Sequence, residues 1–142
     1  MDLVSTPTAV VREEMAIDEI PRRVGSMFDA VYTALPSSPA TQDGQNIAVY
    51  APNGDGRDVV EVGVQVAEPF EGSDALVCSA LPSGPALHHR HVGSYALIGP
   101  VFTEMYAWAA DNDLATTGVG VEVYGDHDPD RPITDLYVML AS

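Results

Sequence analysis

The chain has 142 residues, of which 46% are hydrophobic and 19% charged, a composition typical of one globular domain. Its formal net charge at pH 7 is −15, because 21 acidic residues outnumber six arginines. Such a charge repels phosphate backbones and anionic lipid, and it favours a cationic ligand or a basic protein partner. We therefore expect one domain over residues 1–142, with neither a nucleic acid nor a membrane as its partner.

The apolar segments and the cysteine content also bear on location. No apolar run approaches the ~20 residues of a membrane-spanning helix, and no basic-then-apolar leader opens the chain. The lone Cys78 cannot form an internal disulfide, which fits a reducing compartment. These features predict a soluble, cytoplasmic protein.

The first half of the chain predicts three strands and one helix. Residues 8–17 are rich in valine and predict the first strand. A helix is expected from Pro21 until Pro36, because proline is tolerated in a first helical turn and apolar residues follow at helical spacing. The polar stretch 36–45 predicts a loop, and residues 47–51 and 59–67 predict the strands of a hairpin.

The second half predicts the same kinds of element. Residues 76–81 and 87–92 are expected as strands on either side of a Pro-Ser-Gly-Pro kink. Ser94 can cap a second helix. The apolar stripe of this helix consists of Tyr95, Ile98, Phe102, Met105 and Ala109. Residues 119–124 and 133–140 predict a second hairpin.

The second half repeats the first with a shift of 74 positions (124 − 50 = 74), which places Tyr50 on Tyr124. The copies span about 8–67 and 75–141. Two β-α-β-β units predict an α+β fold with pseudo-two-fold symmetry, and a cleft between the copies is a natural binding site. The copies differ where Ala48 falls on Glu122, so that one half carries a carboxylate and the other a methyl group.

Strand alternation assigns side chains to the two faces of the sheet. One face is expected to pack against the helices through Val119, Val121, Val123, Leu136, Val138 and Leu140. The other face is expected to line a ligand groove with Tyr50, Glu61, Gly63, Gly120, Glu122, Tyr124, Tyr137 and Met139. Carboxylates, tyrosines and small residues together are typical of a ligand-lining face, although half-exposed tyrosines are also common on sheets.

Several short motifs, in this order and spacing, resemble the GyrI-like small-molecule-binding domain. They are Leu81-Pro82-Ser83-Gly84, His91-Val92-Gly93-Ser94-Tyr95, Val121-Glu122-Val123-Tyr124 and Thr134-Asp135-Leu136-Tyr137-Val138. That family is similar to the effector-binding domains of AraC-type and MerR-type multidrug regulators. The resemblance implies two β-α-β-β units in a curved antiparallel sheet, with two helices on the convex side and a ligand groove on the concave side.

The resemblance also implies a function. A stand-alone member would bind or sequester hydrophobic or cationic compounds in an aromatic groove against a buried glutamate, and Glu122 matches that glutamate's position. Some relatives are described as hydrolases of strained, cyclopropane-bearing alkylating compounds, which makes hydrolysis an alternative function. A third alternative is a protein-interaction module that uses the acidic surface.

Glu122 is the central candidate on chemical grounds. A carboxylate in an aromatic groove loses hydration, so its pKa should rise, which suits either a general base or a partner for a ligand's cation. In the hydrolytic alternative Glu122 is the base and Tyr124 or Tyr137 the acid. A purely structural alternative pairs Glu122 with Arg12 or Arg90.

The remaining aromatic and metal-ligating residues are less informative. Tyr95 is expected beside the groove, and Trp108 either lines one end of it or packs in the core. The cluster at 88–91 has no third metal ligand at a suitable spacing, and 126–131 lacks the glycine of a calcium loop. We therefore expect no metal and no cofactor, with His91 bonded to the turn before the second helix.

Overall fold

The computed structural model describes residues 2–54, 56–94, 98–125 and 132–141. In these ranges the strands are β1 (Asp2–Leu3), β2 (Pro7–Ala16), β3 (Gln42–Pro52), β4 (Arg57–Val66), β5 (Val77–Ala80), β6 (Gly84–Val92), β7 (Thr116–Tyr124) and β8 (Ile133–Leu140). The helices are α1 (Ile20–Ala34) and α2 (Ile98–Asp111), with short 3-10 turns at Ile17–Glu19 and Leu35–Ser37. Neither helix in the described ranges combines the length and apolar character needed to cross a membrane.

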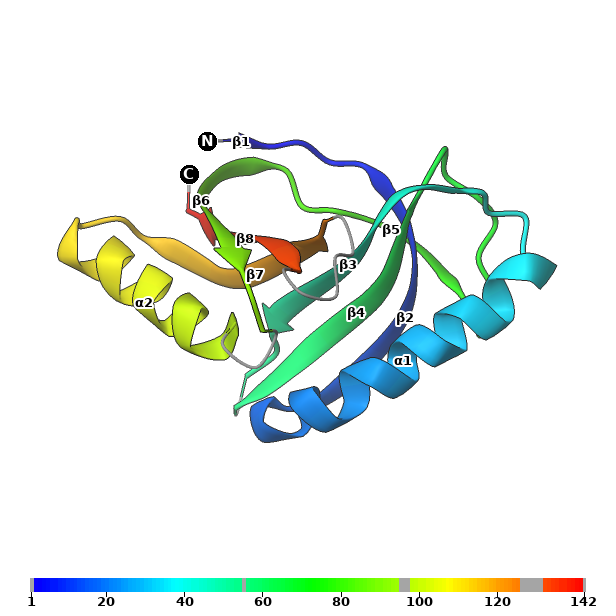
Figure 1. Ribbon diagram of the computed structural model, residues 1–142, viewed down its shortest axis with the longest axis horizontal. Coiled ribbons are helices and arrows are strands. Elements are labelled where there is room, and N and C mark those ends of the chain that lie inside the picture. Colours follow the sequence, from blue (N-terminus) through cyan, green and yellow to red (C-terminus); the bar gives the residue numbers. More distant parts are fainter. Residues whose placement is uncertain (1, 55, 95–97, 126–131, 142) are drawn as a thin grey trace.

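The strands form one antiparallel sheet in the order β1-β6-β8-β7-β3-β4-β2-β5. The sheet curls so that its two ends approach each other, and both helices lie outside the curl (Figure 1). Pro21 lies in the first turn of α1, as expected, because a proline there removes no intrahelical hydrogen bond. The α+β class, the curved antiparallel sheet and the two helices are confirmed.

The duplication is visible in the order of elements, since β2-α1-β3-β4 is followed by β6-α2-β7-β8. Strands β3 and β7 join the two units by pairing antiparallel at the centre of the sheet, with Ala48 opposite Glu122 and Tyr50 opposite Gly120. Because the shift of 74 carries residue 48 onto residue 122, the Ala48–Glu122 pair is its own counterpart. The pseudo-two-fold axis therefore passes between these two residues.

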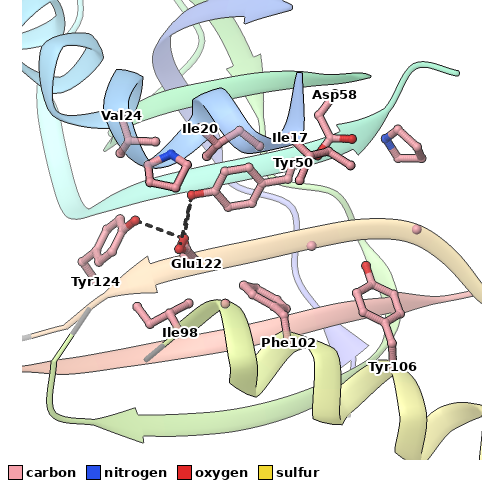
Figure 2. A pocket seen from close by; sticks show the side chains of 15 residues that line it. Ile17, Ile20, Val24, Tyr50, Asp58, Ile98, Phe102, Tyr106, Glu122 and Tyr124 are labelled. Atoms are coloured by element: carbon pink, nitrogen blue, oxygen red, sulfur yellow. Dashed lines mark hydrogen bonds between the residues drawn. The ribbon is translucent and has the colours of Figure 1, made fainter. Parts of the chain in front are cut away.

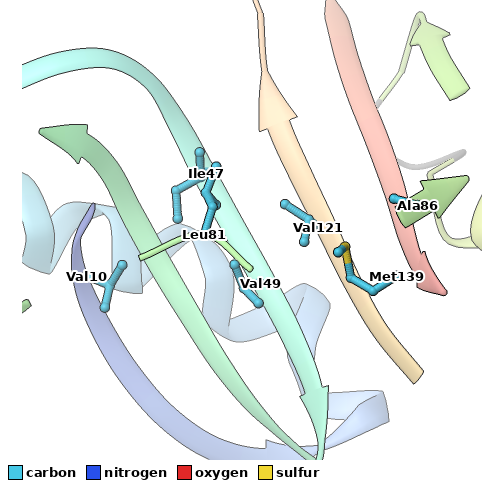
Figure 3. Packing of buried hydrophobic residues seen from close by; sticks show 7 residues of the cluster. All are labelled: Val10, Ile47, Val49, Leu81, Ala86, Val121 and Met139. Carbon is cyan, nitrogen blue, oxygen red and sulfur yellow. The ribbon is translucent and has the colours of Figure 1, made fainter. Parts of the chain in front are cut away.

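Apolar side chains fill both faces of the sheet. The face opposite the helices, inside the curl, carries the cluster Val10, Ile47, Val49, Leu81, Ala86, Val121 and Met139 (Figure 3). On the outer face, Met27 of α1 packs with Met15, Ala48, Val60 and Val62 of the sheet. Ile98 and Met105 of α2 pack with Leu136 and Val138. Each fully buried valine, isoleucine, leucine or methionine among them contributes roughly 1.5–3 kcal/mol to folding.

The predicted face assignment was wrong for β3 and β7. In β7, Val121 points into the curl and Glu122 lies opposite Leu136, which packs against α2. In β3, Tyr50 lies opposite Gly120 and packs with the cluster under α1, so it lies on the helix-bearing face, whereas Glu61 of β4 is on the inner face as expected. Alternation within a strand shows which residues share a face, but it fixes neither the register with the next strand nor the face that a helix covers.

Candidate ligand-binding site

A cavity of about 740 Å³ lies between α1 and α2, above the centre of the sheet (Figure 2). Its lining is mostly apolar and comprises Ile17, Ile20, Pro21, Val24, Tyr50, Pro52, Asp58, Ile98, Gly99, Phe102, Tyr106, Gly118, Gly120, Glu122 and Tyr124. The cavity is therefore on the helix-bearing face. The expectation of a groove on the concave side was therefore wrong. The apolar cluster around Val49 and Val121 fills that side.

Glu122 lies in this cavity with its carboxylate held by two tyrosines. The Tyr50 hydroxyl donates to Glu122 Oε2 at 2.8 Å and approaches Oε1 at 3.2 Å, while the Tyr124 hydroxyl donates to Oε2 at 3.1 Å. Tyr50 and Tyr124 are counterparts in the two repeats, so the two copies converge on one carboxylate. Because both hydroxyls favour Oε2, Oε1 retains capacity for another donor.

Burial shifts the protonation equilibria of this group. Glu122 is only 5% exposed, and this burial raises its pKa to about 6, although the hydrogen bonds from Tyr50 and Tyr124 act to lower it. Burial and the adjacent Glu122 charge also raise the pKa of Tyr50 well above its ordinary value. At neutral pH the site therefore presents a largely ionised carboxylate to an apolar space.

Neighbouring rings hold the two sides of the site in place. The Tyr124 ring packs edge-on against Phe28 of α1, with their centroids 5.7 Å apart. On the other side, Phe102 of α2 lies over Gly120, where an added Cβ would come within 3.2 Å of the ring. The glycine thus leaves the floor of the cavity open beneath α2.

A second carboxylate lines the opposite end of the cavity. Asp58 of β4 and Tyr106 of α2 both lie at the end remote from Glu122 (Figure 2). Burial raises the pKa of Asp58, and burial together with the Asp58 charge raises the pKa of Tyr106. The cavity is therefore apolar in its middle and has a carboxylate near each end.

The structure brings four of the predicted site residues together in the cavity lining, and they are Tyr50, Gly120, Glu122 and Tyr124. Tyr95, another predicted site residue, lies outside the described residues. The four share a face because alternate positions of β7 and the opposed positions of β3 project the same way.

Five other predicted residues lie elsewhere. Glu61 accepts hydrogen bonds from Arg12 and Ser79 on the opposite face. Gly63 faces β2, where an added Cβ would lie 1.9 Å from the Ala9 carbonyl oxygen, so close strand packing accounts for this glycine. The expectation that these two residues share a face with Glu122 was wrong.

Tyr137 and Met139 also belong to the inner face. The Tyr137 ring lies 4.9 Å from the His88 ring, and Met139 is buried in the inner cluster. Tyr137 is therefore on the wrong side of the sheet to act as the acid beside Glu122. Trp108 is 53% exposed on α2 and is absent from the cavity lining, so it neither lines the groove nor packs in the core.

The structural alternative for Glu122 is also wrong, because both candidate arginines have other partners. Arg12 forms an ion pair with Glu61, and Arg90 one with Asp135. His91 contacts the Ser94 carbonyl oxygen through Nε2 at 2.9 Å, the expected bond to the turn before α2. Within the described ranges no three metal-ligating side chains cluster, and the stretch 126–131 lies outside them.

Sequence reasoning missed the cavity residues that come from the helices and from the far end. Phe102 was expected only in the apolar stripe of the second helix, and no site role was expected for Ile20, Val24 or Asp58, all of which line the cavity. One signal was available, because Gly118 and Gly120 alternate on β7 and leave unfilled space on the face that also carries Glu122.

The comparisons with known proteins agree with this architecture. A solved structure of the EcmrR C-terminal domain matches with a TM-score of 0.78 at 14% identity, covering 100% of this chain and 95% of that one. The structure of SAV2435 bound to tetraphenylphosphonium matches with a TM-score of 0.72 at 12% identity, covering 100% and 92%. A search among curated protein sequences found no match.

A family model gives the assignment. The model for the GyrI-like small molecule binding domain matches residues 5–141, nearly the whole chain. The predicted resemblance is thereby confirmed, and the chain belongs to the family of GyrI-like small-molecule-binding domains.

Proposed function

We propose that this protein binds a bulky, apolar cation in the cavity between α1 and α2, and so sequesters it. The observation that supports the proposal is the state of Glu122. Its carboxylate is buried in an apolar cavity, and among the described residues its hydrogen-bond partners are the neutral hydroxyls of Tyr50 and Tyr124. No cation of the described part of the chain balances its charge.

A cationic ligand would supply the missing charge. Burying an ionised carboxylate is costly unless an opposite charge or strong hydrogen bonds accompany it. A delocalised organic cation loses little hydration on entering an apolar space, and it gains the attraction of Glu122 at close range. The rings of Tyr50, Phe102 and Tyr124 line the same space, and each suitably placed ring adds ~0.5–2 kcal/mol of cation–π attraction.

The comparisons support the same ligand class. The similar SAV2435 structure is bound to tetraphenylphosphonium, a bulky cation whose charge is surrounded by aromatic rings. A cavity of about 740 Å³ falls within the usual range for drug-sized ligands. The size, the apolar lining and the buried carboxylate of this cavity therefore suit such a compound.

Hydrolysis is less well supported by the geometry. A ring-opening reaction needs a base to activate water and an acid to protonate the leaving group. Both hydroxyls near Glu122 already donate to its carboxylate, and Tyr50 is a weaker acid than an ordinary tyrosine because its pKa is raised. Tyr137 faces the other side of the sheet.

The test is calorimetric titration of the protein with tetraphenylphosphonium at pH 8, where Glu122 is ionised. Glu122→Gln keeps the shape and removes the charge, so affinity should fall by roughly 1–3 kcal/mol, the range for a charge-assisted contact. Glu61→Gln is the matched control, because it removes one negative charge from the opposite face. Equal losses in the two variants, or no loss in Glu122→Gln, would contradict the proposal.

A further inference from the structure

The end of the cavity remote from Glu122 carries a carboxylate and a tyrosine that a ligand with one positive charge, placed at Glu122, would not contact. Asp58 lies in the lining there, and none of the described residues forms a hydrogen bond or ion pair with its carboxylate. Tyr106 faces it from α2 (Figure 2). A carboxylate and an aromatic ring therefore meet at this end as they do around Glu122.

The strand register gives the spacing of the two carboxylates. Glu122 is opposite Ala48 of β3, and Asp58 is opposite Pro52, so the two acids are four residues apart along β3 (52 − 48 = 4). They also lie on strands either side of β3. Four residues of strand and two inter-strand spacings place their Cα atoms on the order of 15 Å apart.

From this arrangement we propose that the cavity selects elongated dications, in which two cationic groups are joined by an apolar linker. One cationic end meets Glu122 and the tyrosines at the pseudo-two-fold axis, and the other meets Asp58 and Tyr106. The linker lies against the apolar middle of the cavity, beneath Phe102 and beside Ile20. This inference rests on the proposed function and names the ligand class of the same site.

The two ends differ in a way that suits such a ligand. Glu122 is 5% exposed, so the group that meets it must shed its water, whereas Asp58 is half-buried and lets the second group keep part of its hydration. A monocation engages one carboxylate and leaves the other without a partner. A dication of matching length satisfies both, and its second charge adds affinity without further ordering of the protein.

The experiment compares decamethonium with decyltrimethylammonium, which has one cationic end on an equally long chain. Both are titrated by calorimetry into the wild-type protein, Asp58→Asn and Glu68→Gln. Glu68 is an exposed acid that is absent from the cavity lining, so its variant matches the change in net charge. Asp58→Asn should weaken decamethonium roughly threefold to tenfold and decyltrimethylammonium by less than about twofold, while Glu68→Gln changes neither by more than that.

Other outcomes overturn the inference. If Asp58→Asn weakens both compounds equally, or leaves decamethonium unaffected, Asp58 does not receive a second cation. Failure of decamethonium to bind overturns it as well. In each case the proposed function is judged separately, because tetraphenylphosphonium binding that depends on Glu122 would still stand.

Discussion

The two repeats contribute equally to the frame of the site and unequally to its chemistry. Each supplies one tyrosine, Tyr50 or Tyr124, and both hydroxyls reach the same point beside the pseudo-two-fold axis. At the axis only the second repeat supplies a carboxylate, because the counterpart of Glu122 in the first repeat is Ala48. Two carboxylates at directly opposed positions of an antiparallel pair would repel each other. The two repeats thus build a symmetric frame, and one asymmetric pair at the axis, Ala48 and Glu122, gives its centre a charge.

The far end of the cavity breaks the symmetry a second time. Asp58 and Tyr106 come from different repeats, and the shift of 74 relates them to Pro132 (58 + 74) and Tyr32 (106 − 74). Pro132 carries no charge, and the Tyr32 hydroxyl donates to the side-chain oxygen of Asn46. The pair that faces the cavity at one end therefore has no equivalent on the symmetry-related side.

Restoring the symmetry of the axis should have the largest effect. Ala48 is fully buried beneath α1, so Ala48→Glu would place a second carboxylate beside Glu122 in a packed core. We expect the free energy of unfolding to fall by about 3 kcal/mol or more, measured by urea denaturation at pH 8. Ala48→Gln separates size from charge and should lose less. Equal losses for the two variants would show that steric crowding, not charge, keeps this position small.

Removing the charge of Glu122 should have a smaller effect on the free energy of unfolding, and that effect should be stabilising. The folded pKa of Glu122, about 6, exceeds its ordinary value of 4.5, so the native state holds this proton more tightly than the unfolded chain. Stability is therefore lost as the pH rises from about 4.5 through 6, by about 2 kcal/mol in all. Glu122→Gln abolishes this loss.

Urea denaturation at several pH values measures that effect. Relative to the wild type, Glu122→Gln should gain about 2 kcal/mol between pH 4 and pH 8. Glu61→Gln, which breaks the ion pair with Arg12, is expected to lose stability instead. A pH-independent difference between Glu122→Gln and the wild type would mean that the burial of this carboxylate carries no cost.

Much of the fold was accessible from the sequence because its signals are local or repeated. The 74-residue shift predicted the duplicated β-α-β-β units, and Tyr50 and Glu122 were both identified from it and from the family motifs. Alternation correctly grouped Gly120, Glu122 and Tyr124 on one face. Proline and glycine placed most of the element ends, apart from β3, which begins at Gln42 inside the predicted loop.

The sequence did not show which strands place their polar residues on the helix-bearing face of the sheet. Tyr137 was predicted to share a face with Glu122, but it lies opposite Val121 on the other face. The register between β7 and β8 depends on the whole hairpin, and alternation within either strand does not fix it. The roles of Asp58 and Tyr106 were missed because the two residues come from different repeats and face each other only across the cavity. Such contacts between distant segments leave no periodic signal in the chain.

Titration of Glu122, followed through its side-chain carboxyl carbon by nuclear magnetic resonance, tests directly whether this carboxylate meets the ligand's cation. In the free protein we expect a pKa of about 6 for Glu122. When tetraphenylphosphonium saturates the cavity, the nearby positive charge should lower that pKa by at least about one unit. An unchanged pKa for Glu122 in the saturated complex would contradict the claim that this carboxylate meets the ligand's cation.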